Sequence, residues 1–557
     1  MSLIVEDGDE LPDIASTLRC DNAKLGKVTA QGIDKRSPLR NQKLARAMQH
    51  QCRLLIPVLS AGQLSVTSLG LFQRARFQQS IRLITMGDQS MSARPNYDVN
   101  TIRQQDLQHH FHPFTDFSTF KDTGSMIFTG AEGAYVIDSE GQRYLDGIGG
   151  LWCVNIGYGR EEMAEAMAAQ ARQMVYYSSF GHHTSVPAAQ LAAKIAELAP
   201  GTLNHVFYGS GGSVANDTAV RMIHFYFNRL GKPTKKKIIT RHDGYHGSTY
   251  LTMSMTGVAF DHIGFDLVGD GLIHRVSSPN TYRRPAGMSE AEFLEHLVAE
   301  FRAKIEELGA ENVAAFFAEP IQGAGGVIVP PKHYHRRMAE VCRDYGVLYV
   351  ADEVVTAFGR LGHFFASEAV FNMVPDMITS AKGLSSAYAP LSATIISDEI
   401  YDVLSVPQAK GAMFTHGFTY SGHPVCCAAG LKNIEIMERE NLCGHVRELG
   451  PYFEKRLREL SELPLVGDVR GSHFMLCVEN VADKETKELL APEIGIGKRI
   501  ATECQARGVL VRPIGHLNVL SPPLTLNRAQ VDHLVDVLGA SIKAVADGLA
   551  REGVRLR

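Results

Sequence analysis

The sequence lacks the closely spaced cysteine pairs that stabilise small secreted proteins or hold structural zinc ions. Its nine cysteines are scattered, with only Cys426 and Cys427 adjacent and no C-x-x-C pair. Neither a disulfide framework nor a cysteine-based zinc site is therefore indicated. Free thiols in a reducing compartment, and hence a cytoplasmic location, are the expectation.

An overall excess of basic residues is also absent, because the formal net charge is -4. Nucleic-acid binding is therefore not expected, whereas small acidic or amine ligands remain possible. Hydrophobic residues make up 45% of the 557 positions and charged residues 21%. These proportions are typical of a globular protein with ample core, and the length allows two to four domains.

Acidic residues are missing from residues 35–85, which carry nine Lys or Arg. Within this stretch, residues 54–73 are uncharged, but a proline and several polar side chains make them marginal as a membrane span. We expect residues 1–95 to be a poorly ordered extension, with a targeting segment or a segment that contacts a membrane as the alternatives. An over-long gene start, with Met86 or Met91 as the initiator, would give such an extension. No stable membrane association is expected.

Short apolar runs alternate with amphipathic stretches through the middle of the chain. Residues 238–240, 314–318 and 347–351 have the length and composition of buried strands, whereas residues 290–308 have helical periodicity. This alternation is typical of a mainly parallel sheet covered by helices on both faces. Beyond residue 414, long helical stretches and short strands predict a smaller α+β domain.

A single lysine follows one of the apolar runs. Lys382 precedes a glycine and small hydroxyl residues at 383–385. An amine at the end of a buried strand, with its pKa lowered by desolvation, can attack a carbonyl and hold pyridoxal phosphate (PLP) as a Schiff base. Taken alone, the position is better explained by a surface lysine in a strand-to-helix turn.

Two further strand ends favour the chemical explanation. Residues 346–354 form a short β-rich run that ends on Asp352, and residues 206–213 lead into a glycine- and serine-rich turn before a predicted helix at 214–221. Ligands of open α/β sheets collect at the carboxyl ends of strands, and free N–H groups at a helix start can bind phosphate. The chain thus offers a phosphate cradle, a carboxylate and an amine, the three groups that PLP requires.

From about Thr119 to the C-terminus, roughly four-fifths of its length, the chain resembles the class III, or omega, aminotransferases of fold type I. The resemblance is specific because many motifs recur in order. Besides the three stretches above, they are Gly150-Leu151-Trp152, Asp243-Gly244-Tyr245-His246-Gly247, Ala318-Glu319-Pro320-Ile321-Gln322-Gly323, Thr415-His416-Gly417-Phe418-Thr419-Tyr420-Ser421-Gly422-His423-Pro424 and Val511-Arg512-Pro513.

The resemblance implies an α/β fold, that of the fold type I PLP-dependent transferases. A large, mainly parallel mixed-sheet domain is expected beside a smaller C-terminal α+β domain. The expected boundaries are an extension at 1–95, an N-terminal segment at 96–160 that contributes to the small domain and the active-site mouth, a PLP-binding domain at 161–416 and a small domain at 417–557.

The resemblance also assigns roles to individual residues. Lys382 would hold PLP and, once displaced by substrate, move a proton between the substrate carbon and the cofactor. Asp352 would pair with the pyridine nitrogen, and Tyr245 would stack on the ring unless it is only a packed loop tyrosine. The phosphate would be bound by three consecutive residues, Gly211, Gly212 and Ser213. Because Gly211 and Val214 depart from the commoner Ser-Gly-Ser-Glu-Ala pattern, one side-chain phosphate contact is expected to be missing.

Other positions extend the expected site. Val354 is counted among the cofactor-binding residues, and Val355 is expected as an apolar wedge near the ring. Thr419 would reach the phosphate of the neighbouring subunit, which implies a homodimer with shared active sites. Trp152 would line the substrate mouth or anchor the core, and Arg512 would bind a substrate carboxylate unless it is an ordinary surface arginine.

Several polar residues are expected to have supporting roles only. His246, Glu319 and Gln322 would lie behind the cofactor contacts, or simply be hydrogen-bonded groups of the core. No metal site is expected. Three histidines near the start of the family match are interpreted as a polar loop cluster because no carboxylate or cysteine completes a ligand set; they are His109, His110 and His112.

The predicted function is PLP-dependent transamination from an amine or omega-amino acid to a keto acid such as pyruvate. An aminomutase or racemase on the same scaffold is the alternative, because both would use the same proton transfer at Lys382. A regulatory protein without PLP is a third possibility. The sequence does not name the amino donor; beta-alanine, diamines such as putrescine, taurine-like amines and arylalkylamines are candidates.

Overall fold

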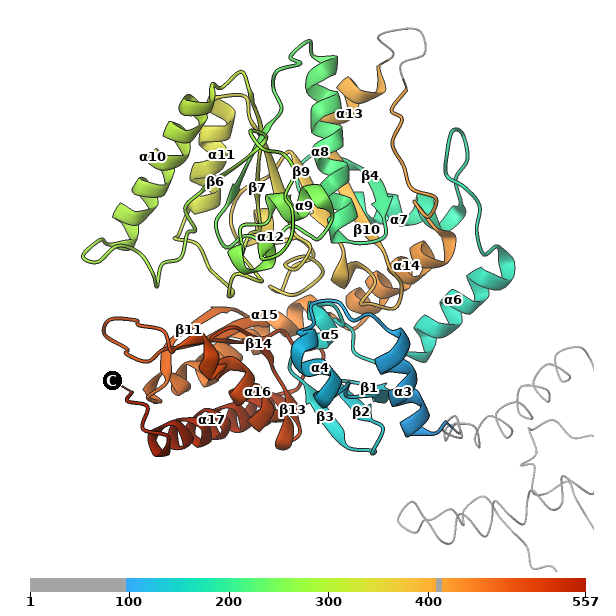
Figure 1. Cartoon of the computed structure of the whole chain (residues 1–557). Coiled ribbons are helices and arrows are strands. Elements are labelled where there is room, and N and C mark those ends of the chain that lie inside the picture. Colours follow the sequence, from blue (N-terminus) through green and yellow to red (C-terminus); the bar gives the residue numbers. More distant parts are fainter. Residues whose placement is uncertain (1–96, 407–412, 557) are drawn as a thin grey trace, which may run out of the picture. The chain divides into compact units, whose positions relative to one another are not determined.

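The computed structural model describes residues 97–406 and 413–556 (Figure 1). The chain divides into two compact units, Met1–Thr101 and Ile102–Arg557, and every described sheet belongs to the second. The predictions for residues 1–95 lie outside the described residues. In the part of the chain that is described, no helix is both long and apolar enough to cross a bilayer. The cytoplasmic location stays a prediction.

Residues 203–397 of the second unit contribute a seven-stranded sheet in the order β4-β10-β9-β8-β7-β5-β6. Strand β10 runs antiparallel to its neighbours β4 and β9, and the other adjacent pairs are parallel. The predicted mainly parallel mixed sheet is therefore confirmed. Its strands are β4 (Leu203–Gly209), β5 (Lys237–Arg241), β6 (Ile273–Val276), β7 (Val313–Ala318), β8 (Leu348–Asp352), β9 (Met377–Ser380) and β10 (Ser392–Ser397).

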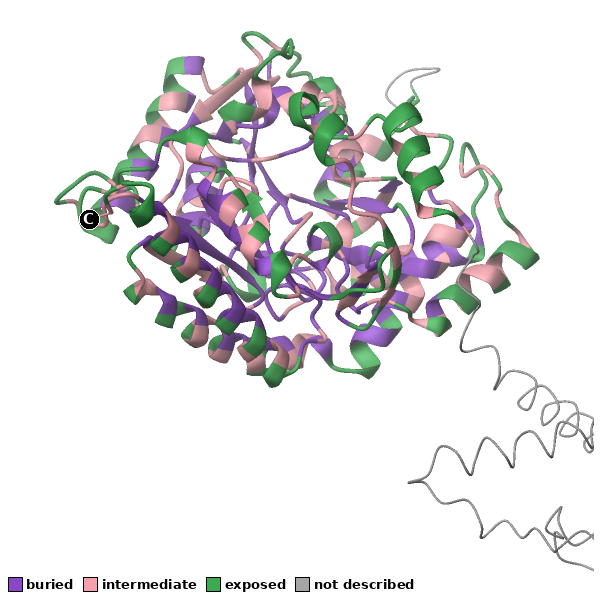
Figure 2. Ribbon diagram, turned by 60° about the horizontal axis from the view of Figure 1, so that its bottom comes forward, coloured by how far each residue is buried: buried purple, intermediate pink, exposed green. Residues whose placement is uncertain are grey.

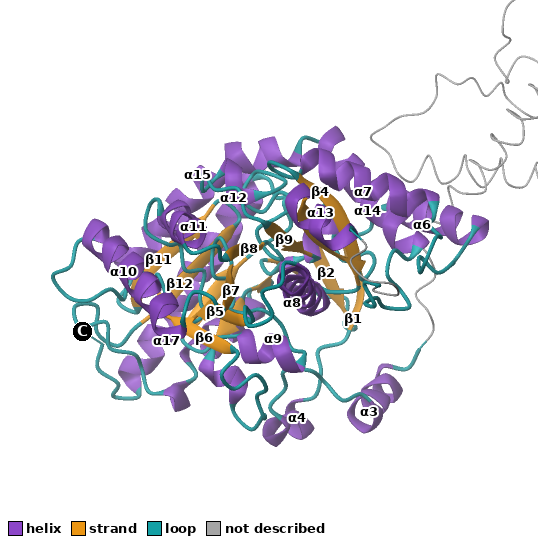
Figure 3. Cartoon of the chain, turned by 90° about the horizontal axis from the view of Figure 1, so that it is seen from above, coloured by secondary structure: helices purple, strands orange, loops and turns teal. Residues whose placement is uncertain are grey.

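Helices cover both faces of this sheet, as Figure 3 shows for α8 on one side and α10 and α11 on the other. Side chains alternate along a strand, so each face of β7 packs into a different apolar cluster. Phe316 belongs to the cluster that includes α10 and α11, whereas Phe317 belongs to the cluster that includes α8. All six residues of β7 are buried, and Figure 2 shows buried residues concentrated in the strands and on the inner sides of the helices.

The helices begin where the sequence supplies capping groups. Ser289 and Glu292 form a capping box at the start of α10, and Asn527 and Gln530 form one at α17. The helices are α3 (Val99–His109), α4 (Phe117–Thr123), α5 (Gly149–Trp152), α6 (Glu161–Gln173), α7 (Val186–Leu198), α8 (Gly212–Arg229), α9 (Tyr250–Met255), α10 (Glu290–Leu308), α11 (Tyr334–Asp344), α12 (Ala366–Ala369), α13 (Asp398–Ser405), α14 (Pro424–Arg439), α15 (Leu442–Arg458), α16 (Ile496–Ala506) and α17 (Arg528–Arg551).

Two four-stranded sheets complete the unit. The first contains β1 (Phe128–Glu132), β2 (Tyr135–Asp138), β3 (Arg143–Asp146) and β13 (Val509–Leu510), so the N-terminal strands receive one strand from the C-terminal part of the chain. The second has the order β11-β12-β15-β14. Its strands are β11 (Val466–Ser472), β12 (Met475–Asn480), β14 (Arg512–Ile514) and β15 (Leu517–Leu520).

The predicted domain boundaries at 160 and 416 stay predictions. Helix α14, placed beyond the second boundary, packs against α6 and α7. Helix α6 ends at Gln173, because Met174 takes up an extended conformation with φ -162° and ψ 108°. The residues that follow are not helical, and the hydroxyl of Tyr176 donates to the carbonyl of Thr419 at 2.6 Å.

Candidate active site

Lys382 lies just beyond the end of β9, in the short turn Lys382–Leu384. Its φ is +40°, a left-handed value that is uncommon for a residue with a side chain and that often marks functional positions. Burial lowers the pKa of its ammonium group, while the charges of Asp352, Cys153 and Glu319 raise it in part. The strand end therefore holds an amine that loses its proton more readily than a lysine in water.

Asp352 ends the neighbouring strand β8 and is 3% exposed. Its Oδ2 accepts hydrogen bonds from Asn216 Nδ2 and His246 Nδ1, both at 2.8 Å. Thr379 donates to the amide oxygen of Asn216 at 2.8 Å, which fixes the amide orientation. The other carboxylate oxygen, Oδ1, accepts only from the Val354 N–H, at 3.2 Å, among the described residues. It can therefore accept one more strong donor.

The start of α8 lies beside this carboxylate. Gly211, the residue before the helix, has an extended backbone and provides no side-chain cap. A Cβ atom on Gly212 would lie 2.9 Å from Cγ1 of Val354, so only glycine allows this contact. The Ser213 hydroxyl accepts from the Ser248 N–H at 3.0 Å. Uncapped N–H groups at the start of an 18-residue helix form an anion-binding site.

Tyr245 is held in place through its backbone. Its N–H donates to Glu319 Oε1 at 2.9 Å, and the Gly323 N–H donates to Oε2 of the same carboxylate at 2.8 Å. Burial raises the pKa of Glu319. The hydroxyl of Tyr245 lies 2.8 Å from that of Ser248. Glu319 therefore ties the loop of Tyr245 to the glycine loop, residues 322–326, that follows β7.

The supporting residues are buried and largely satisfied. His246 has one ring nitrogen on Asp352, while its Nε2 is buried without a partner among the described residues. Gln322 donates to the His242 carbonyl at 2.8 Å and accepts from the Ser278 hydroxyl at 3.2 Å. These contacts fit supporting positions behind the strand ends, and the roles themselves stay predictions.

Trp152 is 5% exposed and has a φ of +64°. It belongs to an apolar cluster with Val327, Met475 and Val519, and Val355 packs against that cluster. Its ring approaches within 3.5 Å of the position that a Cβ on Gly323 would occupy. The structure therefore gives Trp152 the surroundings of a core anchor beside the glycine loop, and its contact with substrate stays a prediction.

Arg512 begins β14, and its guanidinium group has no hydrogen bond or ion pair to any described residue. Burial lowers its pKa, while Tyr245 and Asp261 raise it through their charges. The side chain is thus a partly buried cation near Tyr245, not an arginine in a surface ion pair. Sequence reasoning did not find Asp261, because this residue does not lie at the end of a predicted strand and belongs to no recognised motif.

Arg512 lies in the same row of paired residues across its sheet as another arginine. The paired residues across the four strands are Arg470, Cys477, Val519 and Arg512. Directly paired residues point to the same face of a sheet, and three strand spacings separate the two arginines by about 14 Å. This face of the sheet packs on Trp152 through Cys477 and Val519.

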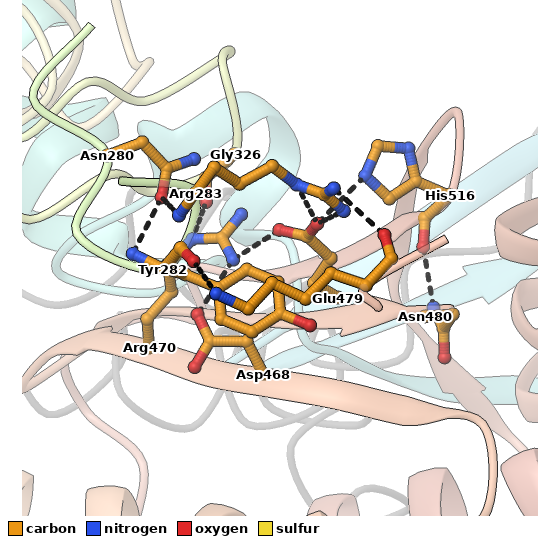
Figure 4. Close-up of polar contacts among 10 residues, drawn as sticks. Asn280, Tyr282, Arg283, Gly326, Asp468, Arg470, Glu479, Asn480 and His516 are labelled. Carbon is orange, nitrogen blue, oxygen red and sulfur yellow. Dashed lines mark hydrogen bonds and ion pairs between the residues drawn. The ribbon is translucent and has the colours of Figure 1, made fainter. Parts of the chain in front are cut away.

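Arg470 and Glu479 connect this sheet to the loops of the larger one (Figure 4). Arg470 donates through Nε to the Gly326 carbonyl at 2.7 Å and through Nη1 to Glu479 at 2.5 Å. Glu479 also pairs with Arg283, in the loop after β6, and lies 3.4 Å from His516 Nε2. A Cβ on Gly326 would lie 2.8 Å from Arg470 Nη2, so the glycine loop packs directly on this sheet. We call these four residues, Arg283, Arg470, Glu479 and His516, the Glu479 network.

Replacing Glu479 with glutamine should lower the melting temperature by about 3–6 °C at pH 7, because Arg283 loses its carboxylate partner and the buried Arg470 keeps only Asp468. Burial alone would raise the pKa of Glu479, but His516, Arg470 and Arg283 outweigh it and hold the pKa at about 2. The unfolded value is near 4.5. The stabilisation is therefore complete above pH 4.5 and is lost as the pH falls towards 2.

Differential scanning fluorimetry between pH 7 and pH 3 checks this, with Glu552→Gln as the matched control. Glu552 pairs with Arg499 on the surface, where an ion pair contributes little. The deficit of Glu479→Gln should stay constant down to about pH 5 and shrink below pH 4.5. A deficit no larger than that of Glu552→Gln would contradict the assigned strength of the network.

Thr419 stands apart from the other predicted site residues. It is exposed, and its carbonyl accepts from Tyr176. Among the described residues its side chain makes no hydrogen bond to Lys382, Asp352 or Ser213. The structure thus brings together the ends of β8 and β9, the start of α8 and the loop of Tyr245, and leaves Thr419 facing outwards.

Comparisons with known proteins agree with this geometry. Residues 119–542 match the family described as aminotransferase class-III. Over 428 residues the chain is 43% identical to the putrescine–pyruvate aminotransferase of Pseudomonas aeruginosa. The alignment covers 77% of this chain and 92% of that protein. It is 40% identical to the diaminobutyrate–2-oxoglutarate transaminase of Halomonas elongata, covering 80% of this chain and 96% of that protein.

Solved structures give the same result. An (S)-enantioselective omega-transaminase from Thermomicrobium roseum superposes with a TM-score of 0.78 at 40% identity, covering 81% of this chain and 99% of that one. The omega transaminase of Pseudomonas jessenii, solved in complex with PMP, superposes with a TM-score of 0.78 at 37% identity, again covering 81% and 99%.

PLP is the cofactor of this family, and the residues present fit it. Asp352 Oδ1 has room for a ring N–H donor, α8 begins with uncapped N–H groups, and Lys382 provides the amine. A Cβ on Gly247 would lie 2.5 Å from both Ser213 Oγ and Thr252 Oγ1, so glycine keeps the turn beside the start of α8 narrow. By sequence, fold and site, the chain is a PLP-dependent enzyme that belongs to the class III aminotransferases.

Proposed function

We propose that this enzyme transfers the amino group of an amine or diamine without a neighbouring carboxylate, such as putrescine, to the keto acid pyruvate. The observation that carries the proposal is Arg512, a partly buried cation near Tyr245 with no ion pair among the described residues. A keto acid would supply its missing carboxylate partner. The 43% identity to a putrescine–pyruvate aminotransferase supports the choice of substrates.

PLP, when bound, supplies an aldehyde that takes up the amino group and a ring that withdraws electrons from the substrate carbon. Lys382 Nζ, whose pKa is lowered by burial, would accept the proton released from that carbon and deliver it to the cofactor. Asp352 Oδ1 would hold the proton of the ring nitrogen. His246 and Asn216 donate to Oδ2 and so hold the carboxylate in a fixed orientation.

The remaining contacts would position the cofactor. The N–H groups of Gly212 and Ser213 at the start of α8 would bind its phosphate, with Gly211 leaving the approach open. Tyr245, held by Glu319, would cover one face of the ring. Val354, packed on Gly212, would close the other end of the cradle.

The phosphate site would be completed by Thr419 of the partner subunit in a homodimer. In this chain Thr419 is exposed, and its backbone is fixed by Tyr176. Large apolar side chains near it are exposed as well, with Phe180 at 52% and Tyr420 at 64%. Exposed apolar groups beside an outward-facing ligand residue are what a shared active site requires.

A half-reaction assay tests the proposal. The tag-free holoenzyme is mixed with each of putrescine, beta-alanine, taurine and 1-phenylethylamine, without a keto acid, and the cofactor absorbance is followed. At least one of these amines should convert the cofactor to its amine form, and pyruvate should then regenerate the starting spectrum with one equivalent of alanine. An aminomutase or racemase would instead return to its starting spectrum without a keto acid. If no amine in the panel shifts the spectrum, transamination of this substrate class is refuted.

A further inference from the structure

Three potential metal ligands converge where α3 ends, far along the chain from the residues of the active site. They are Asp106 Oδ1, His110 Nδ1 and His112 Nε2, and all three atoms lie within 4.8 Å of one another. The distances from Asp106 Oδ1 are 3.1 Å to His110 and 2.9 Å to His112. The sequence reasoning that set these histidines aside assumed that no carboxylate was near; Asp106 supplies one.

The spacing explains why the three groups meet. Asp106 and His110 are four residues apart at the end of a helix, so they lie on the same face. His112 follows in the turn after α3, where the chain bends back towards the aspartate. A pattern of Asp-x-x-x-His-x-His is thus sufficient to gather one carboxylate and two imidazoles without any distant segment.

The distances suit a small divalent cation. Zinc binds histidine nitrogen and carboxylate oxygen at about 2.0–2.2 Å, so tetrahedral ligand atoms lie about 3.3 Å apart. The two separations from Asp106, 2.9 and 3.1 Å, differ from this value by a few tenths of an ångström, and all three ligand atoms lie within 4.8 Å of one another. Both imidazole rings are hydrogen-bonded to Asp106 Oδ1, so an ion could replace the N–H protons while the same three atoms act as ligands.

A fourth residue prepares the carboxylate. The Ser125 hydroxyl donates to the other oxygen of Asp106, Oδ2, at 2.6 Å. This bond turns Oδ1 towards the histidines and leaves it free for an ion, as the outer contacts of metal sites commonly do. The side chains of Asp106 and His112 are only 15% and 19% exposed, whereas His110 is 62% exposed and faces the solvent.

Beside these groups the surface is hollowed. An open cavity of about 420 Å³ is lined by Asp106, His110, His112 and Ser125 on its polar side and by Ile102, Met126 and Ile127 on its apolar side. It offers room for a water molecule or a small anion as a further ligand.

We propose that Asp106, His110 and His112 bind one divalent cation of the zinc type, with a water molecule from the cavity completing the coordination. Two imidazoles and one carboxylate favour zinc, cobalt or nickel over magnesium and calcium, which prefer oxygen ligands. The ion would join the end of α3 to the segment around Ser125, just before β1. It would stand apart from the chemistry at Lys382.

Zinc titration of the tag-free, EDTA-treated and dialysed holoenzyme tests the site, with metal content and affinity measured by equilibrium dialysis. We expect one zinc ion per chain at micromolar free zinc, and no competition by a hundredfold excess of magnesium. His110→Gln, His112→Gln and Asp106→Asn should each weaken this binding at least about tenfold, because each removes a direct ligand. All three lie near the surface, and the cofactor absorbance reports whether the variants are folded.

His109→Gln is the matched control, because His109 is the neighbouring histidine on α3 and is not one of the three ligands. It should leave the zinc stoichiometry and affinity unchanged. Unaltered binding in His110→Gln and His112→Gln, an equal loss in His109→Gln, or binding that requires millimolar zinc would each overturn the proposal. Transamination is measured separately, so a failure of the zinc site and a failure of the proposed function are distinguishable.

Discussion

Replacing Lys382 with alanine should reduce the turnover number by about 10⁴-fold or more, because one substitution removes both the amine that holds the cofactor and the base that moves the proton. Cofactor should still bind, since the start of α8 and the carboxylate of Asp352 are unchanged. Single-turnover absorbance measurements with an amine donor give the rate, and the spectrum of the dialysed protein gives the cofactor content.

Lys235→Ala is the control for the general effect of removing a buried lysine. Burial lowers the pKa of Lys235 to about 8, yet this amine donates to the carbonyls of Ala310 and Tyr345, before the amino ends of the strands and not at the carboxyl ends where Lys382 lies. Its loss should reduce stability and leave the rate per folded enzyme nearly unchanged. A Lys382→Ala enzyme with rates close to the wild type would remove the basis for the proposed catalytic role.

Replacing Arg512 with alanine should raise the apparent KM for pyruvate by about 10- to 1,000-fold, which corresponds to about 1.5–4 kcal/mol for a lost charged contact. The half-reaction with a simple amine should change far less, because an amine without a carboxylate gives the guanidinium group nothing to bind. Single-turnover measurements of the two half-reactions separate these effects.

Arg512→Lys provides the matched comparison. It keeps the positive charge and loses the two parallel hydrogen bonds that a guanidinium group can make to a carboxylate, so its KM for pyruvate should fall between those of the wild type and Arg512→Ala. Equal damage to both half-reactions, or damage to neither, would show that Arg512 is not the carboxylate-binding residue.

The sequence was sufficient to predict the strand ends of the site, because each is marked by residues next to one another in the chain. Lys382 and Asp352 follow apolar runs of strand length, and the turn at 211–213 precedes a helix, so their meeting at one edge of a parallel sheet follows from topology. The same reasoning could not find that Thr379 and Asn216 orient Asp352, since these contacts join strands and helices that are 136–163 residues apart.

Interactions between the sheet β11-β12-β15-β14 and the loops of the seven-stranded sheet were the least predictable. Arg470 and Glu479 look like ordinary surface charges of short strands, and only the folded chain brings them to Arg283 and the glycine loop. Asp106 was missed for a different reason. Its distance of four residues from His110 is a helical signal, but the histidines were interpreted as part of a loop, where that spacing has no meaning.

The pairing of β14 with β15 has a consequence for how substrate preference could change. Gly515 and His516 are the only residues between the paired positions Ile514 and Leu517. Because side chains alternate between the two faces of a strand, a slip of β14 by one residue would turn Arg512 away from Trp152 and towards α16, which packs against β14. If Arg512 binds the substrate carboxylate as proposed, one inserted or deleted residue in this hairpin that shifted β14 would change the accepted substrates, without any change in the residues that surround Lys382.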